Sequence, residues 1–213
     1  MNKKYAIFDM DGTLIDSMGY WNNLLQEFLL SQGIKEDVTA LMQQVKTMTM
    51  EQSSAMLSKL YPQLGDPRDF AKNAGALMAR HYAQDIPLKP GVKNYLEKLK
   101  ADGVKMCVAT ITDRKLLEVC FKRLGIDKYF DFTLSANECG KGKDDPEIYL
   151  AACEKFGSTP CETAVFEDAP YALETAKKAG FYTVAVYDDG EKNNLEKAKA
   201  AADEYIDDWS RII

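Results

Sequence analysis

The sequence predicts an α/β protein: a Rossmann-like, doubly wound parallel sheet core with an inserted all-helical cap domain. Short apolar runs alternate with amphipathic helical patterns after residue 87, as strands and crossover helices do in a parallel sheet. Residues 16–86 show helical periodicity alone, directly after a first strand. We therefore expect a core domain of residues 1–15 and 87–213 and a cap domain of residues 16–86.

The first element is the run Tyr5-Ala6-Ile7-Phe8, which is typical of a strand buried on both faces of a sheet. It ends in two carboxylates, Asp9 and Asp11, followed by Gly12. Ligands of open α/β sheets bind beyond the carboxyl ends of the strands, so chemistry is expected here. Two carboxylates this close repel each other unless a cation or a shared proton intervenes. An acidic turn would explain Asp11 and Gly12 but would leave Asp9 unexplained.

The insertion is expected to contain four helices. Apolar residues recur at helical spacing over residues 21–29 and 38–45. Thr49-Met50-Glu51-Gln52 is typical of a capping box that opens a third helix. Asp66-Pro67 predicts an N-cap followed by proline at the first position of a fourth helix. Residues 87–91, which hold two prolines and a glycine, are the expected hinge.

After the hinge, helices and strands alternate. Each apolar run is followed by a helical stripe, and most stripes end at a glycine. The expected strands cover residues 104–109, 132–134, 163–166, 182–186 and 205–206, and the expected helices cover residues 92–99, 116–124, 146–156 and 169–179, with a further charged helix before the last strand.

Composition limits the possible partners. The chain has 213 residues, 46% of them hydrophobic, and a formal charge of −6, which argues against a nucleic-acid surface. No run approaches the roughly 20 apolar residues of a membrane span. Five cysteines without a CxxC pair are typical of reduced thiols, and one histidine argues against a His-rich zinc site. We expect a cytoplasmic monomer that binds neither nucleic acid nor membranes.

Two further strand ends carry polar groups. Thr110 and Ile111 follow the run at 104–109, and a hydroxyl with backbone N–H groups at a strand-to-helix turn suits a phosphate oxygen. Helix capping explains a lone Thr equally well. Glu167 and Asp168 form a second acidic pair after the run at 163–166. Together with the first pair they predict a hard divalent cation, magnesium (Mg²⁺), although Asp168 alone could be an N-cap.

These residues lie in four motifs. Asp9-Met10-Asp11-Gly12-Thr13-Leu14-Ile15-Asp16-Ser17 resembles motif one of the haloacid dehalogenase (HAD) superfamily, and Thr110 matches the position of its second motif. Lys143, in the spacing Lys-x-x-Pro-Glu-Ile-Tyr, resembles motif three, and Glu167-Asp168-Ala169-Pro170-Tyr171-Ala172 resembles motif four. The helical insertion after motif one is similar to the subfamily of β-phosphoglucomutase and phosphoglycolate phosphatase.

The resemblance implies a HAD-like core that hydrolyses a small phosphorylated metabolite through an aspartyl-phosphate intermediate. It implies Asp9 as the nucleophile and Asp11 as the general acid and base. It also implies a set of residues that hold the phosphoryl oxygens (Thr110, the N–H of Ile111, and Lys143) and a set that holds Mg²⁺ (Asp9, the backbone carbonyl of Asp11, Glu167 and Asp168).

A phosphosugar mutase of the β-phosphoglucomutase type is the main alternative. Such an enzyme holds two phosphates, and the subfamily's mutase uses a His and a basic cap residue, where this chain has Trp21 and Met50. Lys46 would restore the missing charge, although the simpler interpretation is that it lies on a solvent-exposed face of a helix. We therefore favour a phosphatase and expect Trp21, Lys46 and Met50 to take part in substrate selection.

Three other functions are less favoured. A dehalogenase lacks the second acid of motif one, and Asp11 is present here. Phosphonate hydrolysis through a cap lysine stays open. A non-enzymatic phospho-acceptor signalling domain places its acid pair and its acceptor Asp on different strands, whereas Asp9 and Asp11 follow the same strand.

Overall fold

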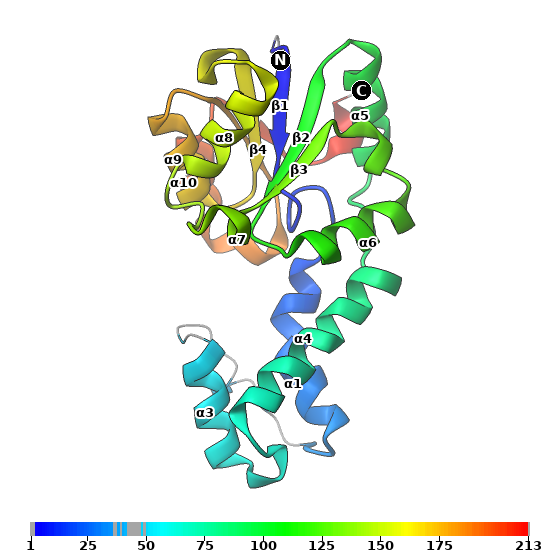
Figure 1. Ribbon diagram of the computed structural model, residues 1–213, viewed down its shortest axis with the longest axis vertical. Helices are drawn as coiled ribbons and strands as arrows, with labels where there is room; N and C mark the ends of the chain where they lie inside the picture. Colours follow the sequence, from blue (N-terminus) through cyan, green and yellow to red (C-terminus); the bar gives the residue numbers. More distant parts are fainter. Residues whose placement is uncertain (1–2, 36–37, 39, 42–47, 49, 213) are drawn as a thin grey trace. The chain divides into compact units, whose positions relative to one another are not determined.

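The structure is a computed structural model that describes residues 3–35, 38, 40–41, 48 and 50–212. The backbone divides into two compact units (Figure 1). One, here called the core unit, consists of Met1–Met18 and Ile86–Ile213, and the other, here called the helical unit, is Gly19–Asp85.

The core unit contains a six-stranded sheet in the order β3-β2-β1-β4-β5-β6, in which every pairing is parallel. The predicted fold class is therefore confirmed. The strands are β1 (Tyr5–Phe8), β2 (Lys105–Thr110), β3 (Phe132–Ser135), β4 (Thr163–Glu167), β5 (Tyr182–Val186) and β6 (Glu204–Ile206).

Helices connect these strands and cover both faces of the sheet (Figure 1). The helices predicted in residues 87–213 are all present, with ends that differ by a few residues. The structure adds a one-turn helix and several 3₁₀ turns there. The helices are α5 (Val92–Ala101), α6 (Arg114–Leu124), α7 (Ala136–Cys139), α8 (Glu147–Phe156), α9 (Pro170–Lys178) and α10 (Leu195–Ala201), and the 3₁₀ turns are η2 (Asp127–Tyr129), η3 (Pro160–Glu162), η4 (Asp189–Asn194) and η5 (Trp209–Arg211).

Strand β1 lies at the centre of the sheet and is buried on both faces, as predicted. Ile7 joins the apolar cluster that includes Tyr149 of α8. Its neighbour Phe8 stacks on Phe166 of β4, with ring centroids 4.4 Å apart, and lies close to Trp209. Because successive strand residues point to opposite faces, both layers of helices pack on the strand that leads into Asp9.

In the part of the chain that the structure describes, the helical unit contains helices and no strand. Its core is formed by apolar side chains such as Phe28, Leu57 and Ala74. Asp66 is an N-cap whose carboxylate accepts a hydrogen bond from the N–H of Arg68 at 2.8 Å, as predicted. The elements are α1 (Met18–Ser31), α3 (Met50–Leu60), η1 (Pro62–Leu64) and α4 (Pro67–Gln84).

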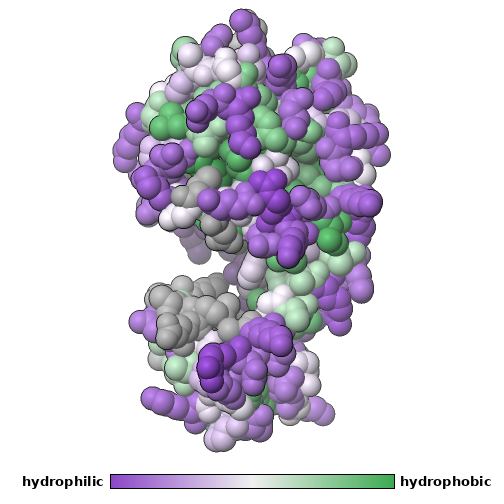
Figure 2. All heavy atoms as spheres, in the orientation of Figure 1, coloured by the Kyte–Doolittle hydropathy of each residue, from purple (hydrophilic) through white to green (hydrophobic). Residues whose placement is uncertain are grey.

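Most of the helix expected over residues 38–45, and Thr49 of the expected capping box, lie outside the described residues. Among the described helices, none combines the length and apolar character that a membrane crossing needs. On the face shown in Figure 2, hydrophilic side chains are spread over both units, with apolar residues between them.

Candidate active site

Three adjacent strands end at one edge of the sheet and bring the predicted site residues together. Asp9 directly follows β1, Thr110 is the last residue of β2, and Glu167 is the last residue of β4. The N–H of Asp9 donates to the carbonyl of Phe166 at 2.9 Å, which ties the first strand end to the third. A pocket of about 210 Å³ lies at this edge and is lined by Asp9, Asp11, Met18, Thr110, Ile111, Thr112, Lys143, Glu167, Asp168, Ala169, Tyr171 and Glu191.

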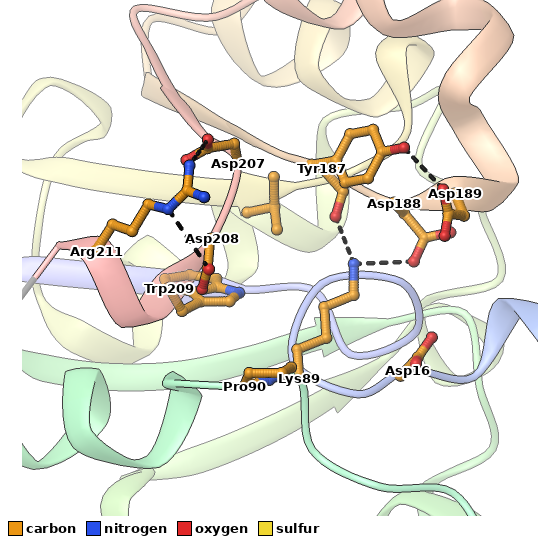
Figure 3. A pocket seen from close by; sticks show the side chains of 11 residues that line it. Asp16, Lys89, Pro90, Tyr187, Asp188, Asp189, Asp207, Asp208, Trp209 and Arg211 are labelled. Atoms are coloured by element: carbon orange, nitrogen blue, oxygen red, sulfur yellow. Dashed lines mark hydrogen bonds and ion pairs between the residues drawn. The ribbon is translucent and has the colours of Figure 1, made fainter.

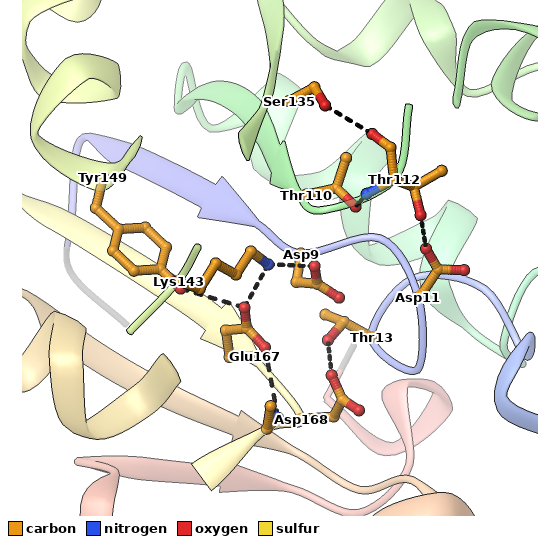
Figure 4. A network of polar contacts seen from close by, with 11 residues as sticks. Asp9, Asp11, Thr13, Thr110, Thr112, Ser135, Lys143, Tyr149, Glu167 and Asp168 are labelled. Carbon is orange, nitrogen blue, oxygen red and sulfur yellow. Dashed lines mark hydrogen bonds and ion pairs between the residues drawn. The ribbon is translucent and has the colours of Figure 1, made fainter. Parts of the chain in front are cut away.

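Three buried carboxylates form a cluster in this pocket (Figure 4). One oxygen from each of Asp9, Glu167 and Asp168 lies within 4.8 Å of the others. The ammonium of Lys143 contacts Asp9 and lies 2.5 Å from Oε1 of Glu167. The hydroxyl of Tyr149 donates to the same Glu167 oxygen at 3.2 Å.

The cluster carries more negative than positive charge, because three carboxylates face the single ammonium of Lys143. Burial raises the pKa of Asp9 to about 8; Lys143 opposes this shift, and Glu167 and Asp11 add to it. Burial, and then the charges of Glu167 and Asp9, hold the pKa of Asp168 well above its usual value. Burial disfavours the Lys143 ammonium, but Asp9 and Glu167 outweigh this and raise its pKa.

The donor set suits a hard divalent cation. Carboxylate oxygens are the ligands that Mg²⁺ prefers, and it usually keeps water and substrate oxygens in its remaining positions. A bound divalent cation would also balance the excess charge of Asp9, Glu167 and Asp168, which burial otherwise makes costly. The three side chains predicted to hold Mg²⁺ therefore lie where one ion can contact all of them.

The loop after β1 lies directly against Asp168. The hydroxyl of Thr13 donates to Oδ1 of Asp168 at 3.1 Å. Gly12 has a φ of +76°, and a Cβ at this position would lie 2.3 Å from Oδ2 of Asp168. The alternative interpretation of Asp168 as a helix N-cap is wrong, because Ala169 occupies that position and no side chain caps α9.

The carboxylate of Asp11 is not part of the acidic cluster. Its Oδ2 accepts a hydrogen bond of 2.6 Å from the hydroxyl of Thr112. Thr110 is buried, and its hydroxyl accepts from the N–H of Thr112 at 3.1 Å. The cap of α6 is Asp113, so the capping alternative for Thr110 is wrong. Ile111 lies between the two threonines and is half exposed.

The residues predicted in the insertion belong to the helical unit. Trp21 of α1 is 39% exposed, and its Nε1 donates to the hydroxyl of Tyr82 at 3.1 Å. Met50 is the first residue of α3. Lys46 lies outside the described residues.

Sequence reasoning missed Thr112 and Tyr149 as parts of the site, and it did not assign Thr13 to Asp168. Thr13 and Tyr149 lie inside motifs one and three, so the motifs could have indicated them. For Thr112, the sequence offers only its position two residues after Thr110. Its contact with Asp11 could not be predicted, because that contact depends on the order of the strands.

A second, larger pocket of about 330 Å³ lies elsewhere on the core unit (Figure 3). Lys89 binds the carbonyl of Tyr187 at 2.5 Å and Asp188 at 2.8 Å. Arg211 pairs with Asp207 at 2.6 Å. Five aspartates line this pocket against these two cations, but Asp188, the buried one among them, is paired with Lys89, so the pocket lacks a cluster of buried carboxylates like that of Asp9, Glu167 and Asp168.

Comparison with known proteins gives consistent results. A family model described as haloacid dehalogenase-like hydrolase matches residues 6–186. The chain is 29% identical over 175 residues to a phosphorylated carbohydrates phosphatase of Thermotoga maritima, which covers 82% of this chain and 81% of that protein. It is 28% identical over 191 residues to a fructose-1-phosphate phosphatase of Escherichia coli, covering 87% and 98% of the two chains.

Two solved structures are similar in fold over nearly the whole chain. A putative β-phosphoglucomutase from Thermotoga maritima superposes with a TM-score of 0.83 and 28% identity, covering 98% of this chain and 96% of that one. A predicted phosphoglycolate phosphatase from Haemophilus somnus has a TM-score of 0.79 over 100% of this chain and 97% of that chain, and at 22% identity it shows the fold alone.

Proposed function

The chain belongs to the haloacid dehalogenase-like hydrolase family, as its motifs predicted, and we propose that it is a Mg²⁺-dependent phosphatase of small phosphate monoesters. The observation that carries the proposal is the buried Asp9 carboxylate. It lies beside Lys143 and within reach of the same cation as Glu167 and Asp168. An aspartate buried among like charges is a functional-site candidate, because structure alone gives no reason to place it there.

In the first step, Asp9 attacks phosphorus in line and forms an aspartyl-phosphate, while the bond to the leaving oxygen breaks. Thr110, the N–H of Ile111 and Lys143 hold the phosphoryl oxygens during the attack. When bound by Asp9, Glu167, Asp168 and the carbonyl of Asp11, Mg²⁺ supplies positive charge for the nucleophile and a phosphoryl oxygen.

Asp11 handles the protons. It gives a proton to the leaving oxygen in the first step, so that an alcohol departs. In the second step it takes a proton from the water that attacks the aspartyl-phosphate, which releases inorganic phosphate and restores Asp9. A carboxylate outside the Mg²⁺ ligand cluster suits this role, because cation binding does not occupy its oxygens.

Sugar phosphates are the proposed substrate class. Two relatives are named as phosphatases of phosphorylated carbohydrates and of fructose 1-phosphate. Among the described residues that line the pocket, Lys143 is the only cation, and it already faces two carboxylates. This arrangement suits a substrate with a single phosphate. Trp21, Lys46 and Met50 keep their proposed part in selecting the leaving group.

A phosphate-release screen tests the proposal. Sugar phosphates, phosphoglycolate, nucleotides and 4-nitrophenyl phosphate are incubated with the protein in Mg²⁺ and in EDTA. We expect phosphate release that requires Mg²⁺. Asp9→Asn should lower kcat by about a thousandfold or more, since it removes the nucleophile, while the variant still folds and shows a cooperative thermal unfolding transition.

Asp127→Asn is the matched control, because Asp127 is exposed in η2, before the amino end of β3. It should keep wild-type turnover. Metal-independent phosphate release, or wild-type turnover by Asp9→Asn, would contradict the proposal.

A phosphosugar mutase is the second candidate, favoured by the likeness to the putative β-phosphoglucomutase of Thermotoga maritima. The distinguishing experiment supplies β-glucose 1-phosphate with its bisphosphate activator. Formation of glucose 6-phosphate faster than inorganic phosphate would select the mutase, and release of phosphate alone would select the phosphatase.

A further inference from the structure

Asp11 differs from the other acids of the site in what holds it. Asp9 and Glu167 contact Lys143, and Asp168 accepts from Thr13. The carboxylate of Asp11 instead turns towards the loop after β2, where the hydroxyl of Thr112 donates to its Oδ2 at 2.6 Å (Figure 4). A hydrogen bond to an ionised group at this length is among the stronger kinds and fixes the direction of the acceptor.

Thr112 is itself held by the elements on both sides of its loop. Its N–H donates to the hydroxyl of Thr110, the last residue of β2, at 3.1 Å. Its carbonyl accepts from the hydroxyl of Ser135, the last residue of β3, at 2.9 Å. Asp113, the next residue, caps α6 by accepting from the N–H of Lys115 at 2.9 Å. The Thr112 hydroxyl is therefore placed by two strands and a helix.

We propose that Thr112 is the positioning residue that aims Asp11 for proton transfer. This inference rests on the proposed phosphatase function. The Thr112 hydroxyl keeps donating to Oδ2 whether Asp11 is ionised or neutral, so the exchanged proton resides on Oδ1. In the first step that proton moves to the leaving oxygen as the bond from phosphorus to that oxygen breaks. In the second step Oδ1 takes a proton from water as the new bond to phosphorus forms. Thr112 touches no reacting atom.

Comparing substrates with different leaving groups distinguishes this positioning role from a merely structural one. 4-Nitrophenol is acidic enough to depart as an anion, whereas a sugar alcohol must receive a proton as it leaves. A misaimed Asp11 therefore slows the sugar ester selectively. Since kcat/KM reports the steps up to the first irreversible one, it isolates the transfer in which Asp11 acts as an acid.

The test compares Thr112→Val, Thr112→Ser and the wild type on fructose 1-phosphate, or on the fastest sugar phosphate of the screen, and on 4-nitrophenyl phosphate. We expect Thr112→Val to lower kcat/KM for the sugar ester by about tenfold to a hundredfold, the range for small misplacements of a catalytic group. The value for 4-nitrophenyl phosphate should change by less than about threefold. Thr112→Ser, which keeps the hydroxyl, should restore the sugar ester reaction.

Thr159→Val is the matched control. Its hydroxyl also donates to a carboxylate, that of Glu162, at 2.8 Å, but it lies before β4 at the opposite edge of the sheet. This variant should hydrolyse both esters as the wild type does.

A second measurement covers the case in which Thr112→Val folds poorly. In an Asp11→Asn background, replacing Thr112 by Ser or Val should cause no further loss on the sugar ester, because the acid it aims is already absent. Equal losses on both esters, no loss on either, or a further loss in that background would overturn the inference while leaving the phosphatase standing. A wild type that hydrolyses neither ester would overturn both.

Discussion

At the residue scale, Gly12 is the position where the backbone conformation of the loop after β1 and the placement of the Asp168 carboxylate depend on each other. Its φ of +76° lies in a region of backbone conformation that residues with a Cβ rarely adopt, and a Cβ there would lie 2.3 Å from Oδ2 of Asp168. Gly12→Ala should therefore lower the free energy of unfolding by about 1–2 kcal/mol from the backbone alone. It should also weaken Mg²⁺ binding, because Asp168 must move. Chemical unfolding and Mg²⁺ titration measure the two effects.

Gly75→Ala provides the comparison for Gly12→Ala. Gly75 lies within α4, has no neighbour within 4 Å of an added Cβ and does not need a positive φ. Alanine there should stabilise the protein by about 0.5–1 kcal/mol. If both variants had the same stability and Mg²⁺ affinity, the close approach of Gly12 to Asp168 would contribute to neither property.

The acids of the site could be predicted from the sequence because they occupy contiguous motifs at strand ends. Asp9 and Glu167 each follow an apolar run, and a reader of the sequence can recognise both junctions. The contacts that fix them could not be predicted in this way. Thr112 reaches Asp11 across 101 positions of the chain, and that distance closes only when β1 and β2 pair. The sequence also permits Asp168 as an N-cap, and only the structure shows that Ala169 occupies that position.

At the element scale, His81 joins α1 and α4 within the helical unit. Its two ring nitrogens lie 2.7 Å from carboxylate oxygens of Glu27 on α1 and of Asp85, the C-cap of α4. The ring is buried and packs on Tyr20, with centroids 4.9 Å apart. His81→Ala should lower the free energy of unfolding by about 1–3 kcal/mol, because the buried ring and both of its hydrogen bonds, to Glu27 and Asp85, are lost. Urea unfolding measures the loss.

Arg80→Ala separates that effect from a general loss of charge on α4. Arg80 also pairs with Glu27, at 3.2 Å, but both side chains are substantially exposed. Exposed ion pairs contribute below about 1 kcal/mol. A loss in Arg80→Ala equal to that in His81→Ala would mean that the buried ring contributes nothing of its own.

Periodicity predicted the elements of the core better than their ends. The helix expected over residues 169–179 is α9, Pro170–Lys178, because proline takes the first helical position and leaves Ala169 outside. The one-turn helix α7, Ala136–Cys139, was not expected, since four residues are too few to show a helical repeat.

At the scale of the whole molecule, the strand order produces the site. β1 lies between β2 and β4, so three strand ends that are far apart in the sequence become neighbours. From β1 the chain adds β2 and β3 on one side of the sheet, and it then adds β4, β5 and β6 on the other side. The strand order therefore changes direction at β1, and the carboxyl end of such a strand is where open α/β sheets bind their ligands. Alternating periodicity predicts a parallel sheet but not the order of its strands, so the central place of β1 comes from the structure alone.

The excess negative charge in the core unit also links global stability to pH and Mg²⁺. Without metal, burial raises the pKa of Asp9 from its usual 3.8 to about 8, and that of Asp168 also rises. A carboxyl with a raised pKa holds a proton in the folded state that the unfolded state has released. Its contribution to stability is therefore complete below about pH 4 and is lost as pH rises towards 8.

Mg²⁺ should reverse this trend, since it binds the ionised carboxylates and must displace those protons at lower pH. For each proton displaced, Mg²⁺ affinity should rise by about tenfold per pH unit below the raised pKa. The increase in Tm on adding Mg²⁺ should accordingly be larger at pH 8 than at pH 6. In EDTA, the Tm should be lower at pH 8 than at pH 6. Asp168→Asn, which removes one ligand, should lose most of the Mg²⁺ effect at both pH values. An equal Mg²⁺ effect at pH 6 and pH 8 in the wild type would mean that Asp9 and Asp168 stay ionised without the cation, and that Lys143 alone balances the cluster.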